Sequence, residues 1–277
     1  MNRESIVAHT LVKNEARWLW YSASSVVNYV DKILLWDTGS TDGTLDIIDE
    51  LKKKYPGKIE FKEYDEVTSE TFTKARQEML DATNSDWFII LDGDEIWFED
   101  SIRKVIEGIK KDGDGIESIV VPTINLVGDI FHYQEKSAGK YKFGNRVGHY
   151  NLRAINRSIP GLHSQGIHGV WGWADGKGKM IQDRDTYKFV DAPYLHATNL
   201  RRSVADAGVI KRSKKYRFEI GEEFPKDYYY PEVFFRDKPA ELTSPWNPMS
   251  ADYKFRAFIE TPLRKFKRRV WLGKPGY

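Results

Sequence analysis

The sequence contains no cysteine among its 277 residues. This absence excludes disulfides, thiolate zinc sites and cysteine nucleophiles, and it restricts any metal site to oxygen and imidazole ligands. The first residues lack the apolar core of a signal peptide, and no stretch approaches the roughly 18 consecutive apolar residues of a membrane span. We therefore expect a cytoplasmic protein in which the sequon at residues 156–158 is not glycosylated.

Several common signature motifs are also missing. The chain has no G-x-x-x-x-G-K-[ST] sequence, and no G-x-G-x-x-G follows its first predicted strand. Neither H-E-x-x-H nor G-x-S-x-G occurs. These absences argue against P-loop nucleotide binding, the dinucleotide fingerprint, zincin proteases and α/β-hydrolases.

Positive and negative charges nearly balance over the whole chain. The formal net charge of +2 is too small for a general nucleic-acid binder, so we expect no nucleic-acid partner. The balance is uneven, because residues 201–277 carry 18 Lys and Arg against 10 Asp and Glu. The hydrophobic content of 40% is sufficient for a large core.

Up to residue 121 the hydrophobic pattern alternates between the periods of strands and helices. Strands are expected at residues 5–12, 32–36, 59–64 and 87–91, and helices at 15–29, 44–55 and 71–83. This alternation predicts an α/β fold, with a Rossmann-like, mainly parallel sheet covered by helices on both faces. Ligands of such sheets bind beyond the carboxyl ends of the strands, where the polar clusters of this sequence lie.

The pattern changes after residue 121, so three parts are expected. Residues 1–121 form the Rossmann-like half, and residues 122–200 form a less regular second half of the same domain. Residues 201–277 form a helical and basic extension, in which a helix begins near Asn199 and an irregular segment rich in Pro and aromatics follows.

The sequence FIILDGDEIW places three acids directly after a predicted buried strand. An acidic turn at a strand end is the simple interpretation of Asp92, Asp94 and Glu95. Such carboxylates also suit Mn²⁺ or Mg²⁺, which are commonly held by one or two carboxylates together with substrate phosphates. Gly93 would allow a tight turn and leave room for a nucleotide.

The second cluster is DTGSTDGT at residues 37–44. It fits a plain strand-to-helix turn, in which Ser40 or Thr41 caps the next helix and Gly39 and Gly43 adopt the tight backbone angles. It also fits a nucleotide site, in which Asp37 at the strand end accepts hydrogen bonds from the base or ribose.

Three segments together resemble a known family. HTLVKNEARWL, KILLWDTGSTDGTLDII and FTKARQEMLDATNSDWFIILDGDEIW resemble, in order and spacing, the family 2 glycosyltransferases of GT-A fold. The likeness covers residues 5 to about 100 and is greatest to bacterial and archaeal transferases of lipopolysaccharide core and cell-surface glycans. It implies metal-dependent, inverting transfer of a sugar from a nucleoside diphosphate sugar, commonly a UDP-sugar, to a hydroxyl of a glycan or lipid-linked acceptor.

The resemblance also implies roles for individual residues of the first half. The loop after the first strand lies near the nucleoside, Asp37 meets the base, and Arg76 reaches the nucleotide. Asp92 lies near the ribose and the metal, Asp94 binds the metal, and Glu95 is the third acid of the motif, on the acceptor side. The residues of that loop in this sequence are Thr10, Lys13, Asn14 and Glu15.

The second half departs from the family pattern at the catalytic base. Relatives often carry a His-Glu pair after a strand similar to LRAINR, whereas this chain has His168-Gly169. Asp175, in a loop rich in Gly and Trp, is the first candidate for the base, and His168 and Asp191 are weaker ones.

Other residues of this half are candidates for metal and acceptor binding. The family often takes one further metal ligand here, for which His196 is preferred and His168 second, although a lone histidine is often a simple polar residue. Trp171 and Trp173 would stack on an acceptor sugar or, equally well, pack in the core.

The C-terminal sequence LRKFKRRVWLGKPGY interleaves basic and aromatic residues. It is compatible with a solvated tail or with peripheral contact to the inner face of an anionic membrane. Two other functions stay open: a non-catalytic nucleotide- or glycan-binding module that lost its base, and a nucleotidyltransferase. The latter would normally show a glycine-rich signature after the first strand.

Overall fold

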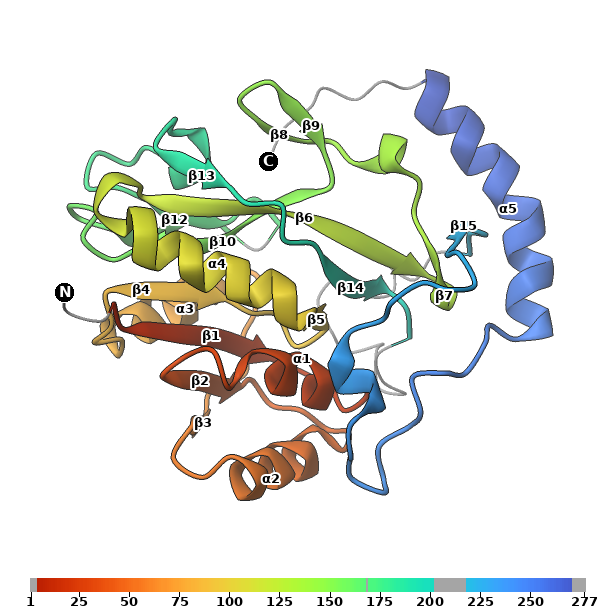
Figure 1. The fold of residues 1–277 in the computed structure, drawn as a ribbon, viewed down its shortest axis with the longest axis horizontal. Helices are drawn as coiled ribbons and strands as arrows, with labels where there is room; N and C mark the ends of the chain where they lie inside the picture. Colours follow the sequence, from red (N-terminus) through yellow and green to blue (C-terminus); the bar gives the residue numbers. More distant parts are fainter. Residues whose placement is uncertain (1–3, 168, 202–217, 271–277) are drawn as a thin grey trace.

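The computed structural model describes residues 4–167, 169–201 and 218–270 (Figure 1). The expected alternation of strands and helices in the first half is confirmed. Each strand and helix begins and ends within about four residues of its expected position. The elements are β1 (Ile6–Val12), α1 (Leu19–Val26), β2 (Lys32–Asp37), α2 (Thr44–Lys54), β3 (Ile59–Glu63), α3 (Phe72–Asp81) and β4 (Trp87–Ile90).

These four strands form a parallel sheet in the order β4-β1-β2-β3. Successive side chains of a strand point to opposite faces, and both faces are covered here. Ile33 and Leu35 of β2 join the cluster beneath α1 and α2, whereas Leu34 and Trp36 pack with Met79 of α3. In Figure 1, α1 and α4 (Glu99–Asp112) lie in front of the sheet and α3 lies behind it.

The second half extends the same sheet. β10 (Tyr150–Asn156) lies between β4 and β6 (Ser118–Val127) and is antiparallel to both. The path continues through β7 (Asp129–Tyr133) to β15 (Glu222–Glu223). The other strands are β5 (Glu95–Trp97), β8 (Tyr141–Phe143), β9 (Arg146–Gly148), β11 (His163–Gln165), β12 (Gly172–Ala174), β13 (Tyr187–Phe189) and β14 (Tyr194–Asn199).

The C-terminal part differs from the expectation of an irregular segment. A 3-10 helix covers Glu232–Phe235, and the 20-residue helix α5 (Ala251–Val270) follows, although it contains Pro262. Most of the helix expected after Asn199 falls on residues 202–217, outside the described residues, as do residues 271–277 of the basic tail. Within the described ranges, no helix is both long and apolar enough to cross a membrane.

His9 is the only histidine of β1, and it lies on the face of the sheet opposite α1. Its ring stacks on Phe88 with centroids 4.5 Å apart, and its Nε2 is 2.6 Å from the Thr83 hydroxyl. Complete burial, together with the positive charge of Arg76, lowers the pKa of His9 to about 3. The core therefore holds this histidine in its neutral form.

Replacing His9 by phenylalanine should weaken the acid sensitivity of the fold. An unfolded chain takes up a proton at His9 below pH 6.5, whereas the folded chain does so only near pH 3. Stability is therefore lost as the pH falls between these values, by about 1 kcal/mol per pH unit. Urea unfolding at several pH values should show a shallower decline for His9→Phe, but an unchanged decline for His163→Phe on β11. Equal slopes for the wild type and His9→Phe would contradict this assignment.

Candidate active site at the carboxyl edge of the sheet

The acidic sequence lies between two strands at the carboxyl edge of the sheet. β4 ends at Ile90, Asp92 follows, and β5 begins at Glu95. β14 pairs antiparallel with β5 and parallel with β6, in a register that sets His196 opposite Glu95. The Ala197 N–H also donates to the carbonyl of Asp94 at 2.9 Å. Backbone pairing alone thus carries a residue of the second half to the acids of the first.

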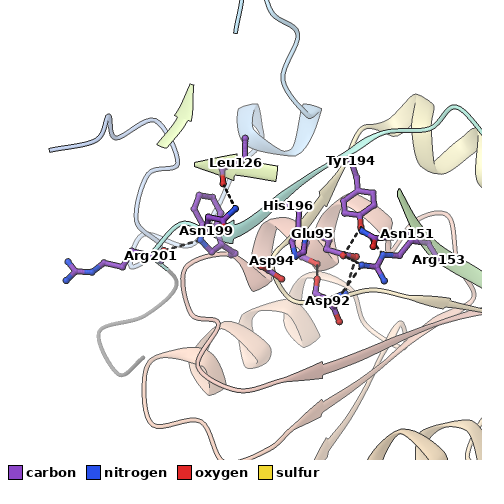
Figure 2. Close-up of polar contacts among 12 residues, drawn as sticks. Asp92, Asp94, Glu95, Leu126, Asn151, Arg153, Tyr194, His196, Asn199 and Arg201 are labelled. Carbon is purple, nitrogen blue, oxygen red and sulfur yellow. Dashed lines mark hydrogen bonds and ion pairs between the residues drawn. The ribbon is translucent and has the colours of Figure 1, made fainter. Parts of the chain in front are cut away.

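Asp94 and His196 are in direct contact at this edge. The Nε2 atom of His196 lies 3.3 Å from Oδ2 of Asp94, whose side chain is 2% exposed (Figure 2). A carboxylate and an imidazole in contact are a suitable pair of ligands for a divalent cation whose other positions are filled by phosphate and water. Among the described residues, no three acidic or histidine side chains lie close enough together to hold a metal ion. The predicted ligands Asp92, Asp94 and His196 therefore do not form a three-ligand site in this structure.

Asp92 is held by two arginines from different elements. Its Oδ1 is 3.2 Å from Nη2 of Arg76 on α3, and its Oδ2 is 3.7 Å from Nη2 of Arg153 on β10. Although loss of solvent acts to raise the pKa of Asp92, the charges of Arg153 and Arg76 keep it below its usual value. Asp92 is therefore a fixed anion, and its side chain is 36% exposed at the surface of the site.

Glu95 faces the interior, in contrast to the acceptor-binding role expected for it. Its side chain is fully buried, and Oε1 is bound by the guanidinium of Arg153 and by the hydroxyl of Tyr194. Burial raises the pKa of Glu95 to about 7, against the opposing charge of Arg153. Asn151 completes the group, because its amide donates to the Tyr194 oxygen at 2.6 Å (Figure 2). Glu95 thus positions Arg153 beneath Asp92.

The loops after β1 and β2 are joined by hydrogen bonds. The N–H of Asn14 donates to the Ser40 hydroxyl and the N–H of Thr41 donates to Oδ1 of Asn14, both at 2.7 Å. Asn14 has the left-handed φ of 56°, which asparagine tolerates better than most residues. Asp37 accepts from the N–H groups of Gly39 and Ser40 at 3.0 and 2.8 Å. Asp37 therefore builds the turn.

The remaining expected donor residues of the first loop have different surroundings. Thr10 is fully buried within β1, on the same face as Ala8 and Val12, and presents no surface to a nucleotide, in contrast to the expectation. Lys13 reaches Glu66 with Nζ 2.6 Å from Oε1. Glu15 is also buried, with its N–H donating to the Thr44 hydroxyl at 2.8 Å.

Gly93 is required by a close approach of side chains. A Cβ at this position would lie 2.9 Å from Cγ1 of Val12 and 3.0 Å from Cγ of Glu15, closer than packed carbon atoms allow. Gly93 has no positive φ, but the expected tight turn is present, because the N–H of Glu95 donates to the carbonyl of Asp92 at 3.1 Å. Gly39 does adopt the expected left-handed angle of 84°, whereas Gly43 has a φ of −75°.

Arg76 contacts two aromatic rings and lies beside Asp92. Its guanidinium carbon is 5.3 Å from the ring centre of Phe72 and 5.2 Å from that of Trp171. Its Nε and Nη1 atoms are buried and, within the part of the chain that is described, have no hydrogen-bond partner. Trp171 thus covers an arginine of the site. Trp173 is 2% exposed and packs on Phe88 in the core, so it is not placed to stack on an acceptor sugar.

The first candidate for the base lies elsewhere. Asp175 accepts hydrogen bonds from the N–H groups of Lys177 and Lys179 and pairs with Arg184, which also binds Glu117. The carbonyl of Glu117 accepts from the N–H of Asn156, the residue paired with Trp87 at the start of β4. Asp175 therefore lies near the amino end of β4, at the opposite edge from Asp92, and the expectation that it is the base was wrong.

The two weaker candidates for the base differ in what can be said of them. Asp191 is exposed between β13 and β14, and its charge acts on Lys104 of α4, which lies over the sheet. His168, also the second candidate for a metal ligand, lies outside the described residues.

Arg153, Tyr194 and Asn151 were missed as site residues. A signal for Arg153 was present, because an arginine within the apolar strand sequence NLRAI must be buried and needs an anionic partner. No local pattern identifies that partner, which lies 58 residues earlier in the chain.

Removing the charge of Arg153 should destabilise the protein strongly. Arg153→Met leaves the buried Glu95 without its cation, and we expect a loss of about 3 kcal/mol at pH 8. Glu95→Gln/Arg153→Met should recover most of this loss, because it leaves no buried charge. Lys53→Met, which breaks an exposed pair with Glu50, should cost less than about 0.5 kcal/mol in the same denaturant series. If the double variant were no more stable than Arg153→Met, the loss of stability would not come from the unpaired charge of Glu95.

Gly93→Ala should cost about 1–3 kcal/mol, because its methyl group meets Val12 and Glu15. Thermal unfolding measures this change. Gly115→Ala is the matched control, since a Cβ there has no neighbour within 4 Å. Adding Val12→Ala to Gly93→Ala should bring back part of the loss, and an equal cost at Gly93 and Gly115 would show that the contact is unimportant.

Solved structures similar to this chain include two described with sugar donors and Mn²⁺. A mannosyltransferase of Pyrobaculum calidifontis, with GDP-Man, is 15% identical with a TM-score of 0.46, over 72% of this chain and 59% of its own. Glucosyl-3-phosphoglycerate synthase of Mycobacterium tuberculosis, with UDP-Glc, is 18% identical with a TM-score of 0.44, over 76% of both chains.

TarS of S. aureus, in complex with UDP, is also similar, with 14% identity and a TM-score of 0.38 over 44% of this chain. The chain spans only 36% of that TarS structure and 59% of the mannosyltransferase. At these identities and scores the likenesses assign no ligand to this site. A comparison with curated protein sequences found no match.

The sequence also matches a family model. The sequence model of glycosyl transferase family 2 matches residues 8–165. This range contains most of β1, the loop after β2, α3 with Arg76, the acidic sequence and β10 with Arg153, and it agrees with the α/β fold described above. Because the match covers more than half of the chain, the protein belongs to glycosyl transferase family 2.

Proposed function

We propose that the carboxyl edge of the sheet transfers a sugar from a nucleoside diphosphate sugar, with UDP-sugars as the first donors to test, to a hydroxyl of a glycan or lipid-linked acceptor, with inversion. The observation that carries this proposal is the contact between Asp94 and His196 beside an Asp92 held by two arginines. Family membership supports the reaction class.

Asp94 and His196 would hold Mn²⁺ or Mg²⁺ in this site. The side chain of Asp94 is buried, that of His196 is 17% exposed, and the two already lie at contact distance, so little rearrangement is needed to bind a cation together with diphosphate oxygens and water. The bound metal would neutralise the negative charge that builds on the diphosphate leaving group. Asp92 stays anionic beside the two guanidinium groups and would meet the ribose.

The protein's own residues would arrange the donor around this pair. The joined loops after β1 and β2, with Lys13, Asn14 and Asp37, would border the nucleoside. Arg76 binds Asp92 through Nη2, its buried Nε and Nη1 atoms have no hydrogen-bond partner among the described residues, and it would attract the diphosphate by its charge. Trp171, which covers Arg76, would exclude water from this side.

A second candidate function is a binding module of the same fold without turnover. The observation that favours it is the absence of the expected acid after His168, together with the position of Asp175 at the opposite edge of the sheet. Nucleotidyl transfer is not favoured, because the chain lacks the glycine-rich signature and matches a glycosyltransferase family.

The transfer proposal is tested with donors, metal and one matched pair of variants. Purified protein is screened with UDP-, GDP- and dTDP-sugars and Mn²⁺ by thermal shift, and donors that bind are then followed for nucleotide release with glycan acceptors. Asp94→Asn should reduce release by about 100-fold or more, because the main metal ligand loses its charge. Asp114→Asn, an exposed acid at the end of α4, should leave the rate unchanged.

The outcomes separate the alternatives. EDTA should abolish the activity of the wild-type protein, and added Mn²⁺ should restore this activity. Nucleotide release that is insensitive to EDTA and to Asp94→Asn would refute the metal role. Metal-dependent donor binding by calorimetry, with no turnover for any acceptor, would favour the binding module instead.

A further inference from the structure

The helix α5 has a narrow inner face and a wide outer one. Tyr253 and Ala257 are buried and pack with Met249, Phe218 and Ile220 in a small cluster separate from the main core. The hydroxyl of Thr261 accepts from the N–H of Ile220 at 2.8 Å. These contacts attach the helix at one side, and Figure 1 shows the helix at the rim of the molecule.

The outer face of α5 is apolar and exposed. Its large side chains recur at the spacing of one helix face, and each is 54–72% exposed. They form the outer stripe of α5: Phe255, Phe258, Ile259, Leu263, Phe266 and Val270. Across the rest of the described chain, the exposed large hydrophobic residues are scattered over loops, short strands, α2 and the 3-10 helix. A continuous exposed stripe of this kind marks an interaction surface.

The charge beside the stripe is strongly positive. The helix carries seven Lys and Arg residues against two acids. Both acids pair with an arginine one turn later, Asp252 with Arg256 at 3.3 Å and Glu260 with Arg264 at 2.6 Å. The surplus is therefore cationic, and Lys254, Lys267 and Arg269 are exposed next to the stripe.

We propose that α5 lies in the interface of an anionic lipid bilayer, with its outer stripe among the acyl chains and its lysines and arginines at the headgroups. An apolar face bordered by basic residues on a 20-residue helix that is attached along one side is the pattern of an interfacial helix. A second copy of this chain is the poorer occupant, because a symmetric contact would bring the two cationic helices together.

The position of α5 relates this surface to the active site. The arrowheads of β1 and β14 point toward the side of the molecule on which α5 lies (Figure 1). A chain of contacts also joins His196 to α5. Asn125 on β6 lies opposite His196 and contacts His149. The Nε2 atom of His149 lies 3.1 Å from the carbonyl of Glu135, and the side chain of Glu135 pairs with Arg268 of α5. A bilayer beneath α5 would thus lie on the side of the site, which suits a lipid-linked acceptor; this last step rests on the proposed function.

Vesicle sedimentation with the full chain tests the membrane contact. The protein should sediment with vesicles of phosphatidylcholine and phosphatidylglycerol in equal parts, and about tenfold less with phosphatidylcholine alone, since the cationic residues require anionic lipid. Binding should weaken as salt is raised, because screening acts on exposed charges.

Paired variants distinguish vesicle binding by the outer stripe from nonspecific hydrophobic binding. Phe255→Ser/Phe258→Ser should reduce binding to the anionic vesicles about tenfold, because two of the six apolar side chains are lost. Val147→Ser/Phe235→Ser removes two comparably exposed apolar residues elsewhere and should change nothing. Lys254→Glu/Arg269→Glu should abolish the preference for anionic lipid, whereas Lys52→Glu/Lys53→Glu on α2 should not. Circular dichroism confirms that each variant is folded.

Two results would overturn the proposal. One is equal sedimentation of the wild type and the Phe255→Ser/Phe258→Ser variant. The other is a wild-type dimer by light scattering that becomes a monomer in this variant and never binds vesicles, which would assign the stripe to a second copy. Asp94→Asn should bind vesicles like the wild type, so failure of vesicle binding and failure of sugar transfer are independent results.

Discussion

The buried charge of Glu95 is the constraint on which the architecture of the site depends. A carboxylate without solvent is costly unless a cation and hydrogen-bond donors surround it, and here they come from β10 and β14. The same guanidinium reaches Asp92, so one arginine joins the interior of the fold to the surface of the site. Shape and charge of the site are therefore set by a group that itself has no access to substrate.

A second level of organisation is the close packing of the loops at the carboxyl edge. The Asn14 amide and the Asp37 carboxylate satisfy backbone N–H groups that the ends of β1 and β2 leave without partners. Val12 and Glu15 close against Gly93. The loops at this edge are thus held in place by the protein's own contacts.

The first half of the fold could be predicted from sequence because its information is local. β1 to β4 alternate with helices, the turn after β2 has its own chemistry, and the three acids after β4 are adjacent in the chain. Asp94 and His196 were also identified and lie together, although only the pairing of β14 with β5 explains why.

Contacts between residues far apart in the chain determine the features of the site that could not be predicted from sequence. Nothing near Asp175 indicates that Arg184 and Glu117 hold it at the far edge, and nothing near Trp173 distinguishes an acceptor platform from a core residue. Likewise, the burial of Glu95 depends on Arg153 and Tyr194, which are 58 and 99 residues away. The helical state of residues 251–270 was obscured by Pro262, which normally disfavours a helix interior.

The insertion of β10 between β4 and β6 has a consequence for how the chain must fold. β4 is apolar on both faces, and until residues 150–156 arrive one of its edges presents open backbone groups, a template for association with other chains. Pairings of such high contact order form slowly, because a long loop must close first. The sheet that begins within the first 121 residues is therefore completed only when β10 pairs with β4 and β6.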